Sequence, residues 1–160
     1  DILIKAFKNI SEKVKNNKLL IVGDGEILSD LKGLAEKMEL KNKIVFTGNV
    51  PHTGVCNFIA SMDICVMPKS NWYGSPVKIF EYGILGKPVI APDNGPLRDV
   101  MIDKVHGLLI YPEIEILTNA ISQLIENEKL RNSLGNNFRN KVNAEHTWEK
   151  MALKILSSIQ

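Results

Sequence analysis

The stretch NWYGSPVKIFEYGILGKPVIAPDNGP, residues 71–96, decides how the rest of the chain is interpreted. It combines a polar loop, a helix, a short apolar strand and a second turn that contains glycine and proline. Ser75 followed by Pro76 is a helix-start signal, because serine caps the first turn and proline at the first helical position loses no needed N–H. We therefore expect a helix from about Pro76 to Leu85.

The predicted helix has two faces. At a turn of about 100° per residue, the residues expected on the buried face are Ile79, Phe80, Gly83 and Ile84. The residues expected on the opposite, open face are Lys78, Glu81, Tyr82 and Leu85. The open face therefore presents a cation and a carboxylate about one turn apart.

Lys78 lies in the first turn, where the helix dipole favours an anion over a cation. A phosphate bound at the helix start would resolve this misfit, because unpaired N–H groups point outward there. Gly74 would let the backbone approach such a ligand closely, and Glu81 could accept hydrogen bonds from a pair of sugar hydroxyls. The alternative is an exposed ion pair between Lys78 and Glu81, worth a few tenths of a kcal/mol. These residues alone leave both interpretations open.

Strands and helices are expected to alternate along the whole chain. The expected strands are residues 18–22, 43–46, 63–67, 88–91 and 107–111. The other expected helices are residues 2–15, 28–38, 53–60, 96–101, 113–126, 128–142 and 147–159. This alternation predicts an α/β fold with a doubly wound, mostly parallel sheet, in one domain that spans residues 1–160.

Four loops that contain glycine or proline follow the predicted strands. They are residues 23–25, 47–51, 68–78 and 93–96. Because ligands of such sheets bind beyond the carboxyl ends of the strands, we expect these loops to form one rim. GDG at residues 23–25 is not a dinucleotide fingerprint, because Leu28 stands where the third glycine is needed, so a nicotinamide enzyme is disfavoured.

Composition excludes several classes of function. The 160 residues carry a net charge of only +2, with the charges interspersed, so no nucleic-acid partner is expected. No apolar run reaches the roughly 18 residues of a membrane helix. Cys56 and Cys65 are expected to be buried and unpaired, and a reducing cytoplasm fits them. His52, His106 and His146 lack ligand spacing and are expected to be ordinary surface or core residues; no metal ligand set is visible.

GSPVKIFEYGILGKPVIAPDNGPLRDV resembles the signature of the retaining GT-B glycosyltransferases of family 4, also called group 1. LLIVGDGE and IVFTGNVP, upstream of it, resemble the same family, and the resemblance covers nearly the whole chain in the right order. It implies the C-terminal, nucleotide-sugar-binding domain, which is the Rossmann-like half of a GT-B fold. The expected ligand is a nucleotide diphosphate sugar as substrate, with no cofactor and no metal.

The resemblance assigns roles to residues of this chain. Glu81 matches the family's second signature glutamate, which is implied to bind the donor ribose. Gly48 and Val50 would line the base, and the backbone at Gly23 and Gly25 would pass near the donor. The residues implied to hold the donor diphosphate are Gly74, Ser75, Pro76, Val77 and Lys78.

The chain also departs from the family pattern. Tyr73 occupies the place of the first signature glutamate, so the catalytic residues stay unassigned and the sugar stays open. The strand that precedes the first helix in the family is missing, which predicts a gap or a rearranged sheet. The family's N-terminal, acceptor-binding domain is missing as well, so we expect a fragment that is inactive alone.

The expected function is the donor half of an enzyme that transfers a sugar from a nucleotide diphosphate sugar to a saccharide or lipid-linked acceptor. Peripheral contact with a membrane surface is an accompanying expectation, because many members of the family use lipid-linked acceptors. One alternative is a non-catalytic GT-B-like interaction module, which the loss of the first glutamate favours. Another is a different GT-B enzyme, such as a sugar-nucleotide epimerase.

Overall fold

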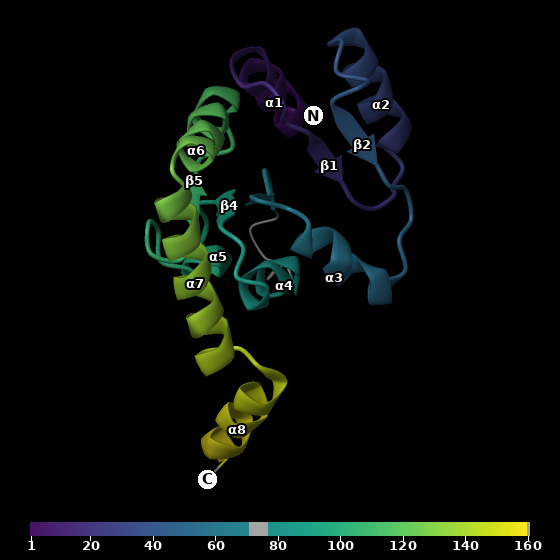
Figure 1. Ribbon diagram of the computed structural model, residues 1–160. Helices are drawn as coiled ribbons and strands as arrows, with labels where there is room; N and C mark the ends of the chain where they lie inside the picture. Colours follow the sequence, from purple (N-terminus) through teal and green to yellow (C-terminus); the bar gives the residue numbers. More distant parts are fainter. Residues whose placement is uncertain (71–76, 160) are drawn as a thin grey trace.

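The structure, a computed structural model, describes residues 1–70 and 77–159 (Figure 1). Its strands are β1 (Leu19–Ile21), β2 (Ile44–Phe46), β3 (Cys65–Val66), β4 (Val89–Pro92) and β5 (Leu108–Ile110). Its helices are α1 (Ile2–Lys13), α2 (Leu28–Lys37), α3 (His52–Ala60), α4 (Val77–Ile84), α5 (Gly95–Arg98), α6 (Ile114–Glu126), α7 (Glu128–Glu145) and α8 (Trp148–Ile159). Each expected strand and helix is confirmed, with shifts at its ends.

The strands pair in parallel, as predicted, but they form two sheets instead of one. β1 pairs with β2, and Leu20 lies opposite Val45. β4 lies between β3 and β5 in the second sheet, where Ile90 lies opposite both Val66 and Leu108. The predicted parallel α/β architecture is therefore confirmed, and the division into two sheets agrees with the expected gap.

Helix α1 lies between the two sheets and explains how the chain stays together across the gap (Figure 1). Its residues Ile4 and Phe7 are buried with Ile44 of β2. Ala6 and Ile10 are buried instead with strands β4 and β5 and with helix α6. Because α1 is apolar on two sides, it packs against both sheets at once.

The larger sheet is covered by helices on both faces. Strand β4 is buried along its whole length, which accounts for its uninterrupted apolar sequence. Val89 and Ala91 pack with residues of α4 and α7 on one face. Ile90, which alternates with them, packs with α1 and α6 on the other face. The sheet thus holds α4 at a fixed position beside the carboxyl end of β4.

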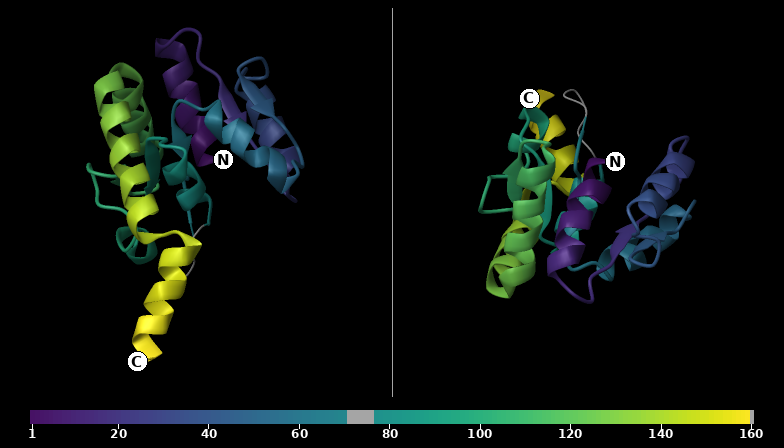
Figure 2. Two further views of the ribbon diagram at one scale, coloured as in Figure 1. Left: turned by 60° about the horizontal axis from the view of Figure 1, so that its bottom comes forward. Right: turned by 90° about the horizontal axis from the view of Figure 1, so that it is seen from above.

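Helix α8 projects away from the body of the molecule beyond α7 (Figure 2). Thr147 caps its first turn, since the Thr147 hydroxyl oxygen accepts a hydrogen bond of 3.3 Å from the Lys150 N–H. Its large apolar side chains are exposed, and Trp148 has 93% of its surface accessible. Over the described residues, no helix is both long enough and apolar enough to cross a bilayer.

Candidate functional site

The loops that follow β1 and β2 are bound to each other. The Gly23 N–H donates a hydrogen bond of 3.2 Å to the Thr47 hydroxyl oxygen. That hydroxyl in turn donates one of 2.9 Å to the carbonyl oxygen of Gly48. Gly23 and Gly48 also form an isolated antiparallel β-bridge. The structure therefore brings together two of the predicted site residues, one from the loop after β1 and one from the loop after β2.

The backbone of these two loops is open to approach from outside. A Cβ atom placed on Gly23, Gly25 or Gly48 would have no heavy atom within 4 Å. Gly23 and Gly48 also adopt φ angles of 119° and 68°, which side-chain-bearing residues rarely adopt. Val50, the other residue predicted to line a base, is half-buried at the end of the β2 loop. The predicted site residues of these loops thus border accessible space.

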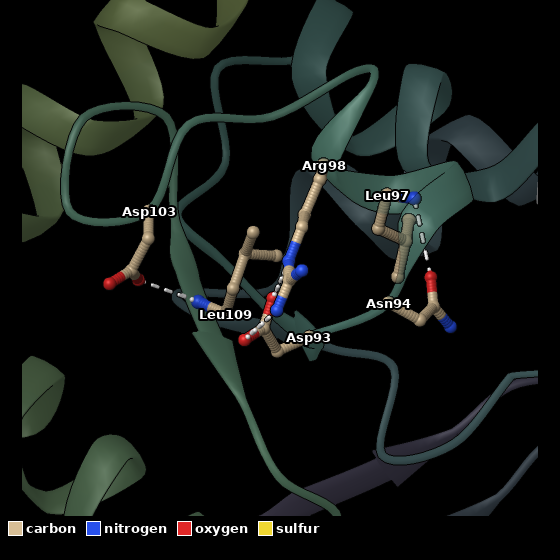
Figure 3. A network of polar contacts seen from close by, with 6 residues as sticks. All are labelled: Asp93, Asn94, Leu97, Arg98, Asp103 and Leu109. Carbon is tan, nitrogen blue, oxygen red and sulfur yellow. Dashed lines mark hydrogen bonds and ion pairs between the residues drawn. The ribbon is translucent and has the colours of Figure 1, made fainter.

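The loops that follow β3 and β4 are also tied together. The Asn94 amide nitrogen donates a hydrogen bond of 2.8 Å to the Ser70 hydroxyl. The Asn94 side-chain oxygen accepts one of 3.3 Å from the Leu97 N–H and so caps the short helix α5 (Figure 3). The predicted turn at 93–96 is therefore held by one side chain that reaches both the β3 loop and the helix after it.

Charged contacts fix the outer side of the same turn (Figure 3). The Arg98 guanidinium donates two hydrogen bonds, of 2.6 and 2.8 Å, to the Asp93 carboxylate. These bonds lower the pKa of Asp93 below its ordinary value of 3.8. The Asp103 carboxylate accepts a bond of 2.8 Å from the Leu109 N–H and holds the connection into β5.

Helix α4 buries an arc centred on Ile79 and Gly83. Gly83 faces Phe138 and Val142 of α7, so α4 and α7 approach closely. Three face assignments from the sequence are wrong, those of Tyr82, Ile84 and Leu85: Tyr82 packs against the core, where burial raises the pKa of its hydroxyl, and Ile84 is exposed. The reason is that α4 contacts α3, α7 and β4, which rotates the buried arc relative to a simple two-sided pattern. Leu85, also predicted on the open face, packs against the same core.

Lys78 and Glu81 lie on the accessible part of α4, as predicted. The Lys78 side chain is exposed, and no carboxylate of the described residues lies within 4.0 Å of its ammonium group. The alternative of a Lys78–Glu81 ion pair is therefore wrong for this structure. Glu81 keeps 24% of its side chain exposed, and its Oε1 atom lies 4.0 Å from Nδ1 of His52.

His52 is the residue that the sequence interpretation missed. It was expected to be an ordinary surface or core residue, yet it connects the β2 loop to Glu81 across a large sequence separation. The signal that could have found it is its position at the start of α3, directly after segment 47–51, which contains the residues predicted to line a base. The other two histidines agree with the expectation: His106 is buried, and the His146 ring packs against Phe80 in a tilted arrangement with 5.2 Å between ring centroids.

Several predicted ligands of the diphosphate lie outside the described residues. They are Gly74, Ser75 and Pro76, and Tyr73 at the place of the first signature glutamate lies outside them as well. Val77 and Lys78, which complete the predicted set, form the exposed start of α4. The described part of the candidate site therefore consists of the β1 and β2 loops, the 93–96 turn, and the residues from Val77 to Glu81.

The cysteines and potential metal ligands are dispersed. Cys65 is buried in the core, and burial raises the pKa of its thiol to about 12. Cys56 is exposed on α3, so the expectation that both cysteines are buried is wrong for Cys56. Neither forms a disulfide. The described residues contain no group of three or more histidine, cysteine, aspartate or glutamate side chains that could hold a metal ion.

Comparison with known proteins gives a consistent result. A family model described as "Glycosyl transferases group 1" matches residues 1–141. An uncharacterized glycosyltransferase of Methanocaldococcus jannaschii is 31% identical over 150 residues, which are 92% of this chain and 38% of that protein. A Corynebacterium glutamicum protein, named a GDP-mannose-dependent monoacylated alpha-(1-6)-phosphatidylinositol monomannoside mannosyltransferase, is 26% identical over 167 residues, which cover 100% of this chain and 43% of that protein.

A solved structure extends the likeness to the fold. The crystal structure of Anabaena HepE in complex with UDP superposes with a TM-score of 0.89 and 21% identity, and the match covers 99% of this chain and 44% of that one. The parallel sheets and their covering helices thus match those of GT-B glycosyltransferases. The chain spans about two fifths of the length of these proteins.

Proposed function

The chain belongs to the group 1 glycosyltransferases, and on this premise we propose that it is the C-terminal, donor-binding domain of a retaining GT-B enzyme of family 4. The whole enzyme would transfer a sugar from a nucleotide diphosphate sugar to an acceptor, either a saccharide or a lipid-linked one. The corynebacterial relative, whose name specifies GDP-mannose and a phosphatidylinositol acceptor, supports this class of reaction.

The observation that carries the proposal is the position of Glu81. Its partly exposed carboxylate faces the start of α3, directly after the β2 loop that contains Gly48 and Val50. A nucleoside bound along that loop would therefore place its ribose hydroxyls beside a carboxylate, which accepts hydrogen bonds from both. The open glycine backbone at Gly23, Gly25 and Gly48 would leave room for the ligand.

The diphosphate would bind at the start of α4. Lys78 is exposed there without a carboxylate partner among the described residues, so its charge is available to a phosphate. Val77 would contribute its backbone N–H, and so would Gly74 and Ser75, with Pro76 shaping the turn; these last three stay sequence-based assignments. Cationic and N–H groups at this place stabilise the negative charge that builds on a leaving nucleotide diphosphate.

Nucleotide binding by the purified chain tests the proposal. Titration calorimetry with UDP, GDP, UDP-glucose and GDP-mannose should detect binding of either the two uridine nucleotides or the two guanosine nucleotides. The measured affinity should be unchanged by EDTA, because we propose that binding needs neither a metal nor another cofactor. A folded sample that binds none of the four ligands would count against the donor-binding role.

A second function has one observation in its favour. Tyr73 replaces the first signature glutamate, which fits a GT-B-like module that has kept the fold for binding and lost catalysis. The longer parent protein distinguishes the possibilities: a transferase forms glycosylated acceptor, an epimerase forms a changed nucleotide sugar, and an interaction module forms neither.

We place the transferase at the cytoplasmic membrane surface when its acceptor is lipid-linked, and binding of the parent to lipid vesicles tests this placement.

A further inference from the structure

We infer that His52 is a second ribose-binding residue, and that one ribose hydroxyl bridges His52 and Glu81. This inference rests on the proposed nucleotide-binding function and adds a residue to the same site. Its starting observation is that the two side chains come from different elements, α3 and α4, and meet at the end of the β2 loop.

The distance between the two side chains fits a bridging hydroxyl. Nδ1 of His52 and Oε1 of Glu81 are 4.0 Å apart, which is too long for a direct hydrogen bond. An oxygen atom about 2.8 Å from each atom fits between them. A hydroxyl is both donor and acceptor, so it can donate to the Glu81 carboxylate and accept from an imidazole N–H. A group that could only accept, such as a phosphate oxygen, would instead be repelled by Glu81.

The exposure of the pair points to an external ligand. The His52 side chain is 86% exposed, so the ring has little contact with the protein that would explain its place by packing. Glu81 is mostly covered, but 24% of its side chain stays accessible and its Oε1 atom lies 4.0 Å from the His52 ring nitrogen. The pair therefore presents one donor and one acceptor to whatever binds at the end of the Gly48–Val50 segment.

Calorimetry with deoxynucleotides tests the bridge. We would measure the affinity of UDP and GDP, and of their 2′-deoxy and 3′-deoxy forms, for the unmodified chain, His52→Ala and Glu81→Gln. His52→Ala should weaken ribonucleotide binding about fivefold. The same substitution should cost nothing further for the one deoxynucleotide that lacks the bridging hydroxyl, because a shared contact makes the losses non-additive. A fivefold loss for all forms, or for none, would overturn the inference.

Control variants separate local contact from folding. His52→Gln keeps an N–H donor near the same place and should recover part of the affinity. Asn57→Ala alters an exposed residue of α3 that lies about 140° around the helix from His52, and it should bind as the unmodified chain does. If the unmodified chain and Asn57→Ala bind, Glu81→Gln weakens binding and His52→Ala does not, only the role of His52 fails. If the unmodified chain binds neither UDP nor GDP, the proposed function fails and the role of His52 falls with it.

Nuclear magnetic resonance gives a test without substitution. The chain has three histidines, and the other two serve as internal references because His106 is buried and His146 packs on Phe80. Addition of the nucleotide that binds should shift the imidazole signals of His52 and leave those of His106 and His146 in place. An unchanged His52 signal at saturation would contradict direct contact.

Discussion

The seam between α4 and α7 and the rim formed by the strand-exit loops are both rich in glycine, but for opposite reasons. In the seam, a Cβ atom on Gly83 would lie 2.6 Å from the Val142 side chain, and one on Gly135 would collide with the carbonyl oxygen of Gly86. On the rim, a Cβ atom on Gly25 or Gly95 would meet nothing within 4 Å. Glycine therefore serves close packing in the seam and leaves open backbone on the rim, where the proposed ligand binds.

Gly135→Ala should produce the largest effect, because the collision is with backbone and not with a side chain that can move. We expect a loss of about 3 kcal/mol in the free energy of unfolding, measured by denaturant titration. Gly33→Ala is the matched control, since Gly33 lies in α2 with open space around it and alanine favours a helix by up to about 1 kcal/mol. An unfolding midpoint for Gly135→Ala equal to that of the original chain would mean that α7 does not pack as closely on α4 as described.

Substitutions on the two faces of α4 should separate stability from binding. Glu81→Ala and Lys78→Ala each remove a proposed charged contact with the nucleotide, so each should weaken UDP or GDP binding about tenfold or more. Neither should change stability by more than about 0.5 kcal/mol, because Lys78 is exposed and the Glu81 carboxylate keeps part of its surface in solvent. Gly83→Ala should do the reverse: it should lower stability through Phe138 and Val142 and leave affinity nearly unchanged among the molecules that fold.

A result in which Glu81→Ala lowers stability as much as Gly83→Ala would assign Glu81 to structure instead of binding. Equal affinity of the Lys78→Ala variant and the original chain would remove Lys78 from the proposed diphosphate site. Thermal unfolding and calorimetry on the same samples give both readouts.

The effect of an alanine substitution on stability should depend, at each rim glycine, on the φ angle of that residue. Gly48 has a φ of 68°, so Gly48→Ala should cost about 1 kcal/mol of stability from strain alone. Gly25 lies outside this left-handed region and has open space, so Gly25→Ala should change stability by less than about 0.5 kcal/mol. If both rim positions border the nucleotide, both substitutions should weaken its binding. Unchanged affinity in Gly25→Ala would restrict the site to the β2 loop and α4.

The sequence predicted the rim better than it predicted the seam. Gly23 and Gly48 follow β1 and β2, and the rule that parallel strands end at one edge was enough to group these two loops. The buried arc of α4 was harder to predict. Tyr82 and Ile84 were assigned to the wrong faces, because a helix surrounded by several elements is not divided simply into an inside and an outside.

Contacts between segments that are distant in the sequence were the other feature that the sequence did not predict. Periodicity predicted α1 but not that it would be buried on two sides. His52 was interpreted from its residue type and the lack of ligand spacing, and its position directly after residues 47–51, at the start of α3, was not used to place it near Glu81. Both errors concern how elements are placed in space, whereas the elements themselves were predicted from local patterns.

Arg98→Ala should have the smallest effect, and it tests how the rim is held. The pKa of Asp93 is lowered by the hydrogen bonds from Arg98, so the pair stabilises the fold above the ordinary pKa of 3.8 and loses that contribution as pH falls through the lower folded value. Because the Arg98 side chain is 60% exposed, solvent screens the pair. We therefore expect a small drop in Tm at pH 7 that disappears in strong acid.

Lys41→Ala is the control for this last substitution, because the Lys41–Glu36 pair is more exposed than Asp93–Arg98 and should leave Tm unchanged. If the Tm difference between Arg98→Ala and the original chain grows toward acid pH, ionised Asp93 is not the partner that Arg98 stabilises. If the difference follows the expected course, the 93–96 turn is held by polar contacts that change with pH, while the α4–α7 seam is held by steric fit that does not. The two glycine-rich regions would then differ in how they are stabilised as well as in why they need glycine.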